Sequence, residues 1–452
     1  MKQASPPPTI PPVGGGLACL TFPYFLLSIL FWAALPSAAQ NLSPDQRQLN
    51  LASFEQVWST VRDKHWETKP AGLDWQAIHE EFLPRVQNAQ NTDDARAAMR
   101  EMLARLHQTH FGILSSSAVA DVDGGAGGDG TTGIDVRVLD GRAIVTEVEP
   151  GSAAARAGVK TGWEIVSVED RELRPLIAKL VADVSVHDLQ LTRAVLARTT
   201  GPVGATHRFV FSASENGSPM TRHLALAQPR GEMAGFGNLA PQPVWFSASR
   251  TGPDRTIALI RLTVFLDLVR VMNQFGEAVK SCGDCKGIII DLRGNPGGIG
   301  GMAMGLAGWL IHPDQKTQPD LRLGSMFMRG AALKFFINPR ADAFKGPVAI
   351  LVDGASASTS EIFAGGLQDL HRARVFGTRT AAAALPSVIT RLPNGDGFQY
   401  AVANYISEGG KALEGNGVTP DVEVRLTREG LLAGHDAVVD AAVEWLGQVA
   451  RR

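Results

Sequence analysis

The sequence predicts an α/β protein with more than one domain and a helical segment near its N-terminus. Three observations lead to this prediction. Apolar residues make up 44% of the 452 residues and charged residues 19%, so the chain can bury a large core and is not mainly disordered. The 48 glycines and 26 prolines favour many turns and short strands over a helical bundle. Strand patterns alternate with helix patterns over residues 235–450, as in layered α/β folds.

Charge and cysteine content exclude several classes of protein. Lys and Arg total 43 and Asp and Glu total 45, and no basic stripe indicates a nucleic-acid partner. Three cysteines are too few for a disulfide-built scaffold. Cys282 and Cys285 form a CxxC pair, for which we expect a structural disulfide or free thiols. The alternatives are a redox pair and, with too few ligands, a metal site.

Residues 1–40 have the features of an export signal. The run over 17–35 carries no charge, and Ser37 and Ala39 supply the small side chains that signal peptidase requires. The run is also just long enough to span a bilayer, so a retained anchor is the alternative. Either way, we expect the chain from residue 41 onward to lie outside the cytoplasm, in the periplasm or facing the extracellular side. Membrane contact is expected only if the segment is retained.

Residues 41–118 are predicted to form a helical domain. Phe54, Val57 and Val61 recur at roughly helical spacing, and two further periodic runs follow, beginning at Trp75 and Ala95. The Gly/Asp-rich stretch within 119–130 predicts a linker.

Residues 131–230 change to short β patterns. Two alternating strands meet at Asp140-Gly141, a hairpin signal. A short Ala-rich helix follows Ser152 and stops at Gly158, and EIVSVED forms the next strand. This pattern resembles a PDZ domain. PDZ domains bind peptide C-termini by adding a strand to a sheet edge. The resemblance implies peptide binding near Thr132, Gly133 and Ile134; the alternative is a small β domain without a ligand.

Residues 235–450 contain three predicted strands, over 257–265, 286–295 and 347–354. The continuously apolar centres of the later two indicate a sheet covered on both faces. Helices are predicted through about Lys280, over 300–311, and from Ser360 onward.

The turn after the third of these strands holds three serines, Ser356, Ser358 and Ser360, and a helix begins directly after it. Unpaired N–H groups at a helix start can stabilise an oxyanion, so a nucleophilic serine is one hypothesis. The alternative is ordinary helix capping, with Glu361 in the first turn.

Two other segments carry weaker signals. The glycine turn in IIIDLRGNPGG exposes backbone amides, although glycines also make such turns without any function. His110 follows a helix and is either structural or catalytic. With His107 it could hint at a metal, but no third ligand is near in the sequence.

Taken in order, DLRGNPGG, SASTSEIFAGGLQD, LPNGDGF and EGNGVTPDVEV, placed after a PDZ-like region, resemble the tail-specific or C-terminal processing proteases. The wider group includes the tricorn-core-like peptidases. The resemblance implies a ClpP/crotonase-like α/β core with an inserted PDZ-like domain. It also implies Ser358 as nucleophile, with the N–H of Thr359 and that of Gly297 or Gly298 as oxyanion donors.

The expected base departs from the processing branch of this family. Its lysine position corresponds to Ala383, and Arg379 cannot replace a lysine because guanidinium stays protonated. The tricorn-like branch instead uses a histidine in a Ser-His pair and a glutamate before the G-V-x-P-D motif. Thr109-His110 and Glu414 match those positions, so we expect His110 as base, oriented by Glu414 and Thr109.

These matches predict an exported serine endopeptidase that cleaves proteins or peptides near a C-terminus. Serine, histidine and backbone amides supply this chemistry, so no metal or cofactor is expected. The alternative is an inactive member that binds peptides on the same fold, which the missing lysine supports. The oligomeric state stays open.

Overall fold

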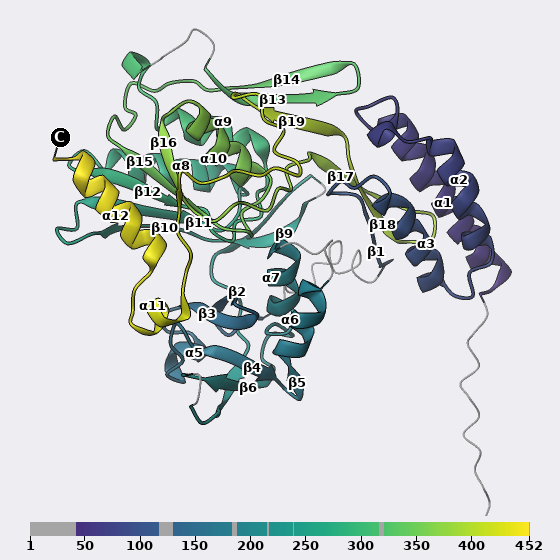
Figure 1. Cartoon of the computed structure of the whole chain (residues 1–452), viewed down its shortest axis with the longest axis horizontal. Helices are drawn as coiled ribbons and strands as arrows, with labels where there is room; N and C mark the ends of the chain where they lie inside the picture. Colours follow the sequence, from purple (N-terminus) through teal and green to yellow (C-terminus); the bar gives the residue numbers. More distant parts are fainter. Residues whose placement is uncertain are drawn as a thin grey trace, which may run out of the picture. The chain divides into compact units, whose positions relative to one another are not determined.

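A six-stranded sheet forms the centre of the C-terminal half, in the order β10-β11-β12-β15-β16-β20. The strands from β11 to β20 run parallel, and β10 pairs antiparallel with β11 at one edge. This arrangement confirms the predicted α/β class (Figure 1). The strands are β10 (Phe246–Thr251), β11 (Ile257–Leu262), β12 (Gly287–Asp291), β15 (Val348–Val352), β16 (Ala373–Gly377) and β20 (Val422–Glu423).

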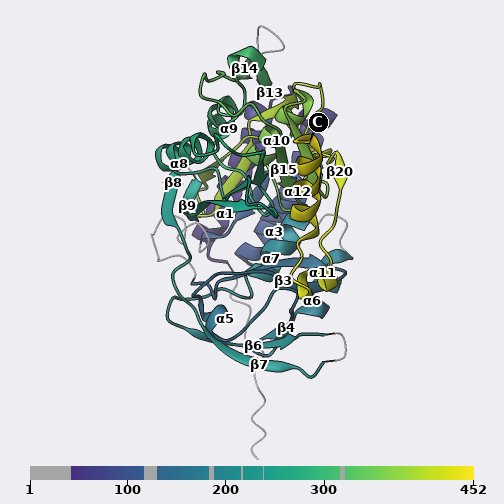
Figure 2. The ribbon, with the colours of Figure 1, turned by 90° about the vertical axis from the view of Figure 1, so that its left-hand side faces the viewer.

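Both faces of this sheet are covered, because alternate side chains of each strand point to opposite sides. On β12, Ile288 and Ile290 pack with α8, α9 and α10, whereas Ile289 packs with α12. The two sides of β15 are covered by the same two sets of helices, visible in Figure 2. The helices are α8 (Leu268–Lys280), α9 (Gly300–Gly308), α10 (Thr359–Asp369) and α12 (Ala437–Val449).

The structure is a computed structural model that describes residues 42–116, 130–182, 188–214, 217–237, 239–315 and 321–451. Residues 1–41, which include the predicted export signal, and most of the predicted linker lie outside these ranges. Among the helices that are described, none combines the length and apolar character needed to cross a membrane. Cys282 and Cys285 form a disulfide shortly after α8, which was one of the expectations for this CxxC pair.

A second sheet occupies the predicted β region, in the order β2-β3-β4-β6-β7, and the short strand β5, which pairs with β4, is its sixth strand. We call residues 130–227 the β-unit. The hairpin at Asp140-Gly141 is present, and so is the short helix after Ser152. Two longer helices were not predicted. The elements are β2 (Ile134–Leu139), β3 (Arg142–Val148), α5 (Ala153–Arg156), β4 (Glu164–Val168), β5 (Arg171–Glu172), α6 (Leu173–Val181), α7 (Asp188–Leu196), β6 (Thr206–Ser212) and β7 (Met220–Ala225).

The N-terminal segment is not wholly helical, which corrects the prediction for residues 41–118. Three α-helices pack together, but the chain then forms a strand, β1 (Gly112–Leu114), paired with β18. Leu392 and Phe398 complete the core of these helices, so the segment shares its core with the C-terminal half. The helices are α1 (Pro44–Lys64), α2 (Trp75–Gln87) and α3 (Thr92–Ala104), with a 3-10 turn, η1 (Pro70–Gly72).

Smaller elements complete the described chain. Two three-stranded sheets have the orders β1-β18-β17 and β14-β13-β19, and β8 pairs with β9 in a ribbon. The remaining elements are β8 (Glu232–Phe236), β9 (Leu239–Val244), η2 (Pro313–Gln315), β13 (Arg322–Met328), β14 (Ala331–Phe336), β17 (Ser387–Arg391), β18 (Gly397–Ala401), β19 (Ala403–Ser407) and α11 (Arg428–Leu432).

A buried ion pair joins the N-terminal helices to the turn between β17 and β18. The Arg96 guanidinium donates from Nε and Nη2 to the two oxygens of Asp396, at 2.9 and 2.8 Å. The Asp396 carboxylate is fully buried. We expect Arg96→Met to lower the free energy of unfolding by about 3–5 kcal/mol, because it leaves a buried carboxylate without its cation. Denaturant unfolding of the purified protein measures this.

The matched control is Arg85→Met, which removes an exposed pair with Glu101. It is expected to cost at most about 1 kcal/mol. Equal losses in the two variants would contradict the assignment of Arg96–Asp396 as the connection between these parts.

Candidate active site

Ser358 lies in the turn between β15 and α10, where parallel-sheet topology brings a strand end next to a helix start. It is the residue directly before α10 and has a φ of 53°, a left-handed conformation that is rare outside glycine. Its neighbours Ser356 and Ser360 are buried, and their hydroxyls donate to the carbonyls of Leu292 and Asn295. Ser358 is half-buried, so it is the serine of this turn that reaches the surface.

The turn after β12 approaches Ser358 closely. A Cβ on Gly297 would lie 2.7 Å from the Ser358 Cβ and 2.8 Å from the Thr359 nitrogen, so a side chain at 297 has no room. The Gly297 N–H donates to the Asn295 Oδ1 at 2.9 Å. Among the described residues, no acceptor is found for the N–H groups of Gly298 and Thr359. Of the two glycines left open by the sequence, Gly298 therefore has the available donor.

Thr109, His110 and Glu414 are brought together although Glu414 is far away in the sequence. Glu414 accepts the Thr109 N–H through Oε1 at 2.6 Å and the Thr109 hydroxyl through Oε2 at 2.9 Å. The Thr109 Oγ1 lies 2.7 Å from the His110 Nδ1. Glu414 thus contacts His110 through the threonine hydroxyl.

This arrangement determines which ring nitrogen of neutral His110 carries the proton. A hydroxyl has one hydrogen, and that of Thr109 is donated to Glu414. The hydroxyl oxygen can then only accept from His110, so the hydrogen of the neutral ring lies on Nδ1. The Nε2 lone pair is left available to accept a proton.

The surroundings of His110 favour its neutral form. Burial, with a smaller contribution from the positive charge of Arg193, lowers the pKa of His110 to about 4. Arg193 belongs to α7 of the β-unit, and burial lowers the pKa of its guanidinium as well. Among the residues that the structure describes, none forms an ion pair with Arg193. No motif in the sequence distinguishes this arginine, and sequence reasoning did not find it.

Glu361 is a buried carboxyl in the first turn of α10. It accepts the N–H of Ser358 at 2.9 Å, the N–H groups of Ala382 and Ala383, and the Thr380 hydroxyl at 2.6 Å. Burial raises the pKa of Glu361 to about 7, and these hydrogen bonds oppose the rise. The carboxyl therefore connects the start of α10 to the segment 380–383.

The same segment connects Ser358 to Glu414. The Ser358 N–H also donates to the Ala383 carbonyl at 2.9 Å, and the Ala384 N–H donates to Glu414 Oε2 at 3.1 Å. Ala383 thus contacts the candidate nucleophile, and the next residue, Ala384, contacts the carboxylate of the His110 group.

Ala383, at the lysine position of the processing branch, has its side chain in a small apolar cluster. The methyl group packs with Ala357 and Ala381, against Leu189 of α7. A lysine at 383 would have to place its side chain in this cluster, and overpacking of this kind costs about 1–3 kcal/mol. The geometry is consistent with a site that does not use a lysine here.

The proposed peptide-binding residues lie at the start of β2. Thr132 is buried, and its carbonyl accepts the Ala154 N–H, whereas Gly133 has a φ of 79° and packs against Ser152. A cavity of about 570 Å³ lies further along. Its lining includes residues 137–139 of β2 with Asp140 of the following turn, Asp188, Leu191 and Thr192 of α7, and residues 352–355. Thr132, Gly133 and Ile134 do not line this cavity.

Comparison with known proteins agrees with this architecture. Residues 256–424 match the model of peptidase family S41, and residues 50–104 match the tricorn protease C1 domain. The chain is 25% identical over 400 residues to the chloroplastic C-terminal processing peptidase of Tetradesmus obliquus, covering 87% of this chain and 79% of that protein. It is 26% identical over 377 residues to a carboxyl-terminal-processing protease of a Picosynechococcus species, covering 81% of each.

Among solved structures, the photosystem II D1 C-terminal processing protease superposes with a TM-score of 0.54 at 22% identity. That match covers 88% of this chain and 99% of the other, and it concerns the fold. The family match over the six-stranded core, the tricorn C1 match over the N-terminal helices and the relatives that span most of the chain agree with one another. Residues 256–424 therefore form a domain of the peptidase family S41 type, within a chain that is similar over most of its length to carboxyl-terminal-processing proteases.

Proposed function

We propose that this protein is an exported serine peptidase that cleaves protein or peptide substrates near their C-termini, with Ser358 as nucleophile and His110 as general base. The observation that carries the proposal is the Glu414–Thr109–His110 chain of hydrogen bonds, attached to the segment that also contacts Ser358. Export rests on the sequence features of residues 1–40, and C-terminal cleavage on the names of the relatives.

In the proposed mechanism, groups of this chain carry out each step. His110 Nε2 takes the Ser358 hydroxyl proton as Oγ attacks the substrate carbonyl carbon. The N–H groups of Thr359 and Gly298 stabilise the oxyanion that forms. The protonated ring returns the proton to the leaving amine, and the acyl-enzyme is then hydrolysed by water, which His110 activates in the same way.

The charge of Glu414 stabilises the imidazolium through the Thr109 hydroxyl. This arrangement differs from a triad in which the carboxylate contacts the ring directly. The Thr109 hydroxyl is therefore the group that keeps the proton of the neutral ring on Nδ1.

The β-unit is proposed to be a PDZ-like domain that binds the substrate's C-terminal tail. Its strand β2 lies at one edge of the sheet of the β-unit, with β7 at the other edge, and it packs beside α7. Extended peptides bind PDZ domains by pairing with such an edge. Two substrates identical except for a free or an amidated C-terminus test this. Faster cleavage of the free form supports tail binding, and equal cleavage of both contradicts it.

The nucleophile is tested by substitution of each serine in the turn. Ser358→Ala is expected to abolish cleavage of an unfolded protein substrate and leave the melting temperature unchanged. Ser356→Ala and Ser360→Ala are the controls, and they should keep activity but lose stability, because each removes a buried hydroxyl with a hydrogen bond. Full activity in Ser358→Ala would overturn the assignment. An inert parent that still binds C-terminal peptides would instead indicate a binding protein.

Substitution of Thr109 tests whether its hydroxyl orients His110. Thr109→Val keeps the shape and removes the hydroxyl, so the Nδ1 proton is no longer oriented. We expect kcat to fall roughly 10²- to 10⁴-fold, the usual contribution of a positioned base. Thr109→Ser restores the hydroxyl and should recover most of the activity. If valine and serine at this position behave alike, the hydroxyl does not orient His110.

The pH profile tests the environment of the base. His110 must be unprotonated, so kcat/KM should persist as the pH falls and decline only near the His110 pKa of about 4. Arg193→Gln removes a positive charge that lowers this pKa, so the acid limb should move to higher pH, toward the ordinary value of 6.5. Arg198→Gln, just beyond α7, is the control and should leave the limb in place. An unmoved limb in Arg193→Gln would show that another group controls the decline.

A further inference from the structure

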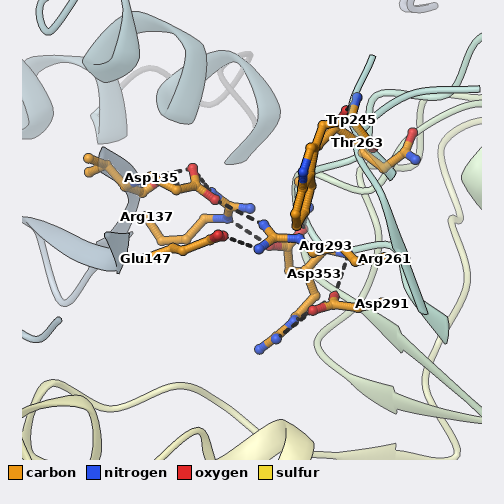
Figure 3. Close-up of polar contacts among 12 residues, drawn as sticks. Asp135, Arg137, Glu147, Trp245, Arg261, Thr263, Asp291, Arg293 and Asp353 are labelled. Carbon is orange, nitrogen blue, oxygen red and sulfur yellow. Dashed lines mark hydrogen bonds and ion pairs between the residues drawn. The ribbon is translucent and has the colours of Figure 1, made fainter. Parts of the chain in front are cut away.

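A cluster of charged side chains lies where the β-unit meets the six-stranded sheet. Figure 3 shows Asp135, Arg137 and Glu147 from the β-unit facing Arg261 of β11 and Asp353, the residue directly after β15. Arg137 is buried although it is charged. Removing a charge from water is unfavourable unless the charge is paired and hydrogen-bonded. The partners of Arg137 therefore indicate which parts of the molecule its burial connects.

Arg137 is paired on both sides of the junction. Its Nε donates to Asp353 Oδ2 at 2.7 Å, and its Nη1 donates to Asp135 Oδ1 and to the Val136 carbonyl, each at 2.9 Å. Burial opposes the charge of Arg137, but the carboxylates of Asp135 and Asp353 raise the pKa of this guanidinium. The Arg137 guanidinium therefore stays charged, and its hydrogen bonds fix its orientation.

Asp353 uses its other oxygen to join the two catalytic turns. Oδ1 accepts the Gly294 N–H at 2.8 Å from the turn after β12, and the Ala355 N–H at 3.0 Å from the turn after β15. The Ser356 Oγ, whose hydrogen is donated to the Leu292 carbonyl, lies 3.2 Å from the same oxygen. One carboxylate thus connects the turn that carries Gly298 to the turn that carries Ser358.

Arg137 also contacts the first of these turns directly. A Cβ on Gly294 would lie 2.1 Å from the Arg137 Nη2, so the guanidinium covers the glycine backbone. Gly294 has a φ of 73° and is followed by Asn295, whose side chain accepts the Gly297 N–H and whose carbonyl accepts the Ala357 N–H. Arg137 is therefore connected to both candidate oxyanion donors through Asn295. One connection runs along the turn to Gly298, and the other runs through the Ala357 N–H toward Thr359.

From this geometry we infer that Arg137, a residue of the β-unit, is a positioning residue for the oxyanion-binding turn of the core. It orients Asp353 and covers Gly294, and so fixes the distance between the N–H groups of Gly298 and Thr359. The inference rests on the proposed function, in which these two groups stabilise the oxyanion. It means that the catalytic turn is completed by a side chain from the β-unit.

The chain offers a matched control. Arg261 belongs to β11 and also joins the core to the β-unit, through Glu147 and, at 3.4 Å, through Asp135. It contacts neither Gly294 nor Asp353 among its described hydrogen bonds. Loss of Arg261 should therefore weaken the contact between the β-unit and the core. It should have no specific effect on the turn that contains Gly294 and Gly298.

The experiment compares Arg137→Met, Arg137→Lys and Arg261→Met in the full chain, beside the parent and Ser358→Ala. We expect Arg137→Met to lower kcat roughly 10- to 100-fold with little change in KM, because misplaced donors weaken the transition state more than the bound substrate. Arg137→Lys keeps the charge without the fork and should be intermediate. Arg261→Met should lower the melting temperature and leave kcat near that of the parent.

Asp353→Asn is a variant that is expected to fold, because its amide oxygen can still accept the N–H groups of Gly294 and Ala355. The double variant Arg137→Met/Asp353→Asn leaves no buried charge unpaired. Its loss of activity should be smaller than the product of the two single losses, since the two side chains act through one contact.

Amide hydrogen exchange measures the turn without turnover. Faster exchange at Gly294 and Ala355 in Arg137→Met, but not in Arg261→Met, supports the inference even if the parent cleaves nothing. An inert parent would contradict the proposed function alone. Equal exchange and equal kcat in Arg137→Met and Arg261→Met, with Ser358→Ala inactive, would overturn the inference and leave the proposed function intact.

Discussion

The parallel pairing of β12 with β15 is the constraint on which the candidate site depends. The pairing places Ile288 opposite Val348 and Asp291 opposite Leu351, so the two strands end at the same edge of the sheet. The turn after β12 supplies backbone amides, and the turn after β15 supplies Ser358 and the start of α10. A slip of this register by one residue would reverse the faces of the buried side chains, so the sheet core also fixes the alignment of the turns.

Three carboxylates then join loops that are distant in the sequence, and they do so in the same way. Asp353 accepts N–H groups from the turns after β12 and β15. Glu361 accepts N–H groups from Ser358 and from the segment 382–383. Glu414 accepts N–H groups from Thr109 and Ala384. A carboxylate that accepts backbone donors stabilises an irregular loop where no strand or helix can satisfy those donors.

The packing around Ala383 leaves no space for a lysine side chain, and the proposed base lies in another part of the chain. Ala383 still contributes its carbonyl to the Ser358 N–H, while its methyl group fills a small cluster beneath α7. His110 approaches from the N-terminal segment instead, and β1 pairs with β18 only two residues after His110. The histidine therefore depends on the N-terminal helices, which share their core with Leu392 and Phe398.

By itself, the sequence determined the class of the fold and the candidate residues, because these depend on local patterns. The buried strands over 287–291 and 348–352 follow from apolar runs bounded by turns, and the place before a helix indicates a serine of the turn 356–360, of which the resemblance selects Ser358. His110 stood out as a single histidine after a helix, but its role as a base, and the roles of Thr109 and Glu414, came only from the resemblance of their motifs. The sequence could not show the strand β1, whose three residues are extended because β18 lies beside them. It also could not show how Glu414 contacts His110, which of Gly297 and Gly298 keeps an available N–H, or that Arg137 and Arg193 of the β-unit lie near the site. Those features depend on contacts between segments that are up to about 300 residues apart, and such contacts are decided by the packing of the whole chain and leave no periodic pattern in the sequence.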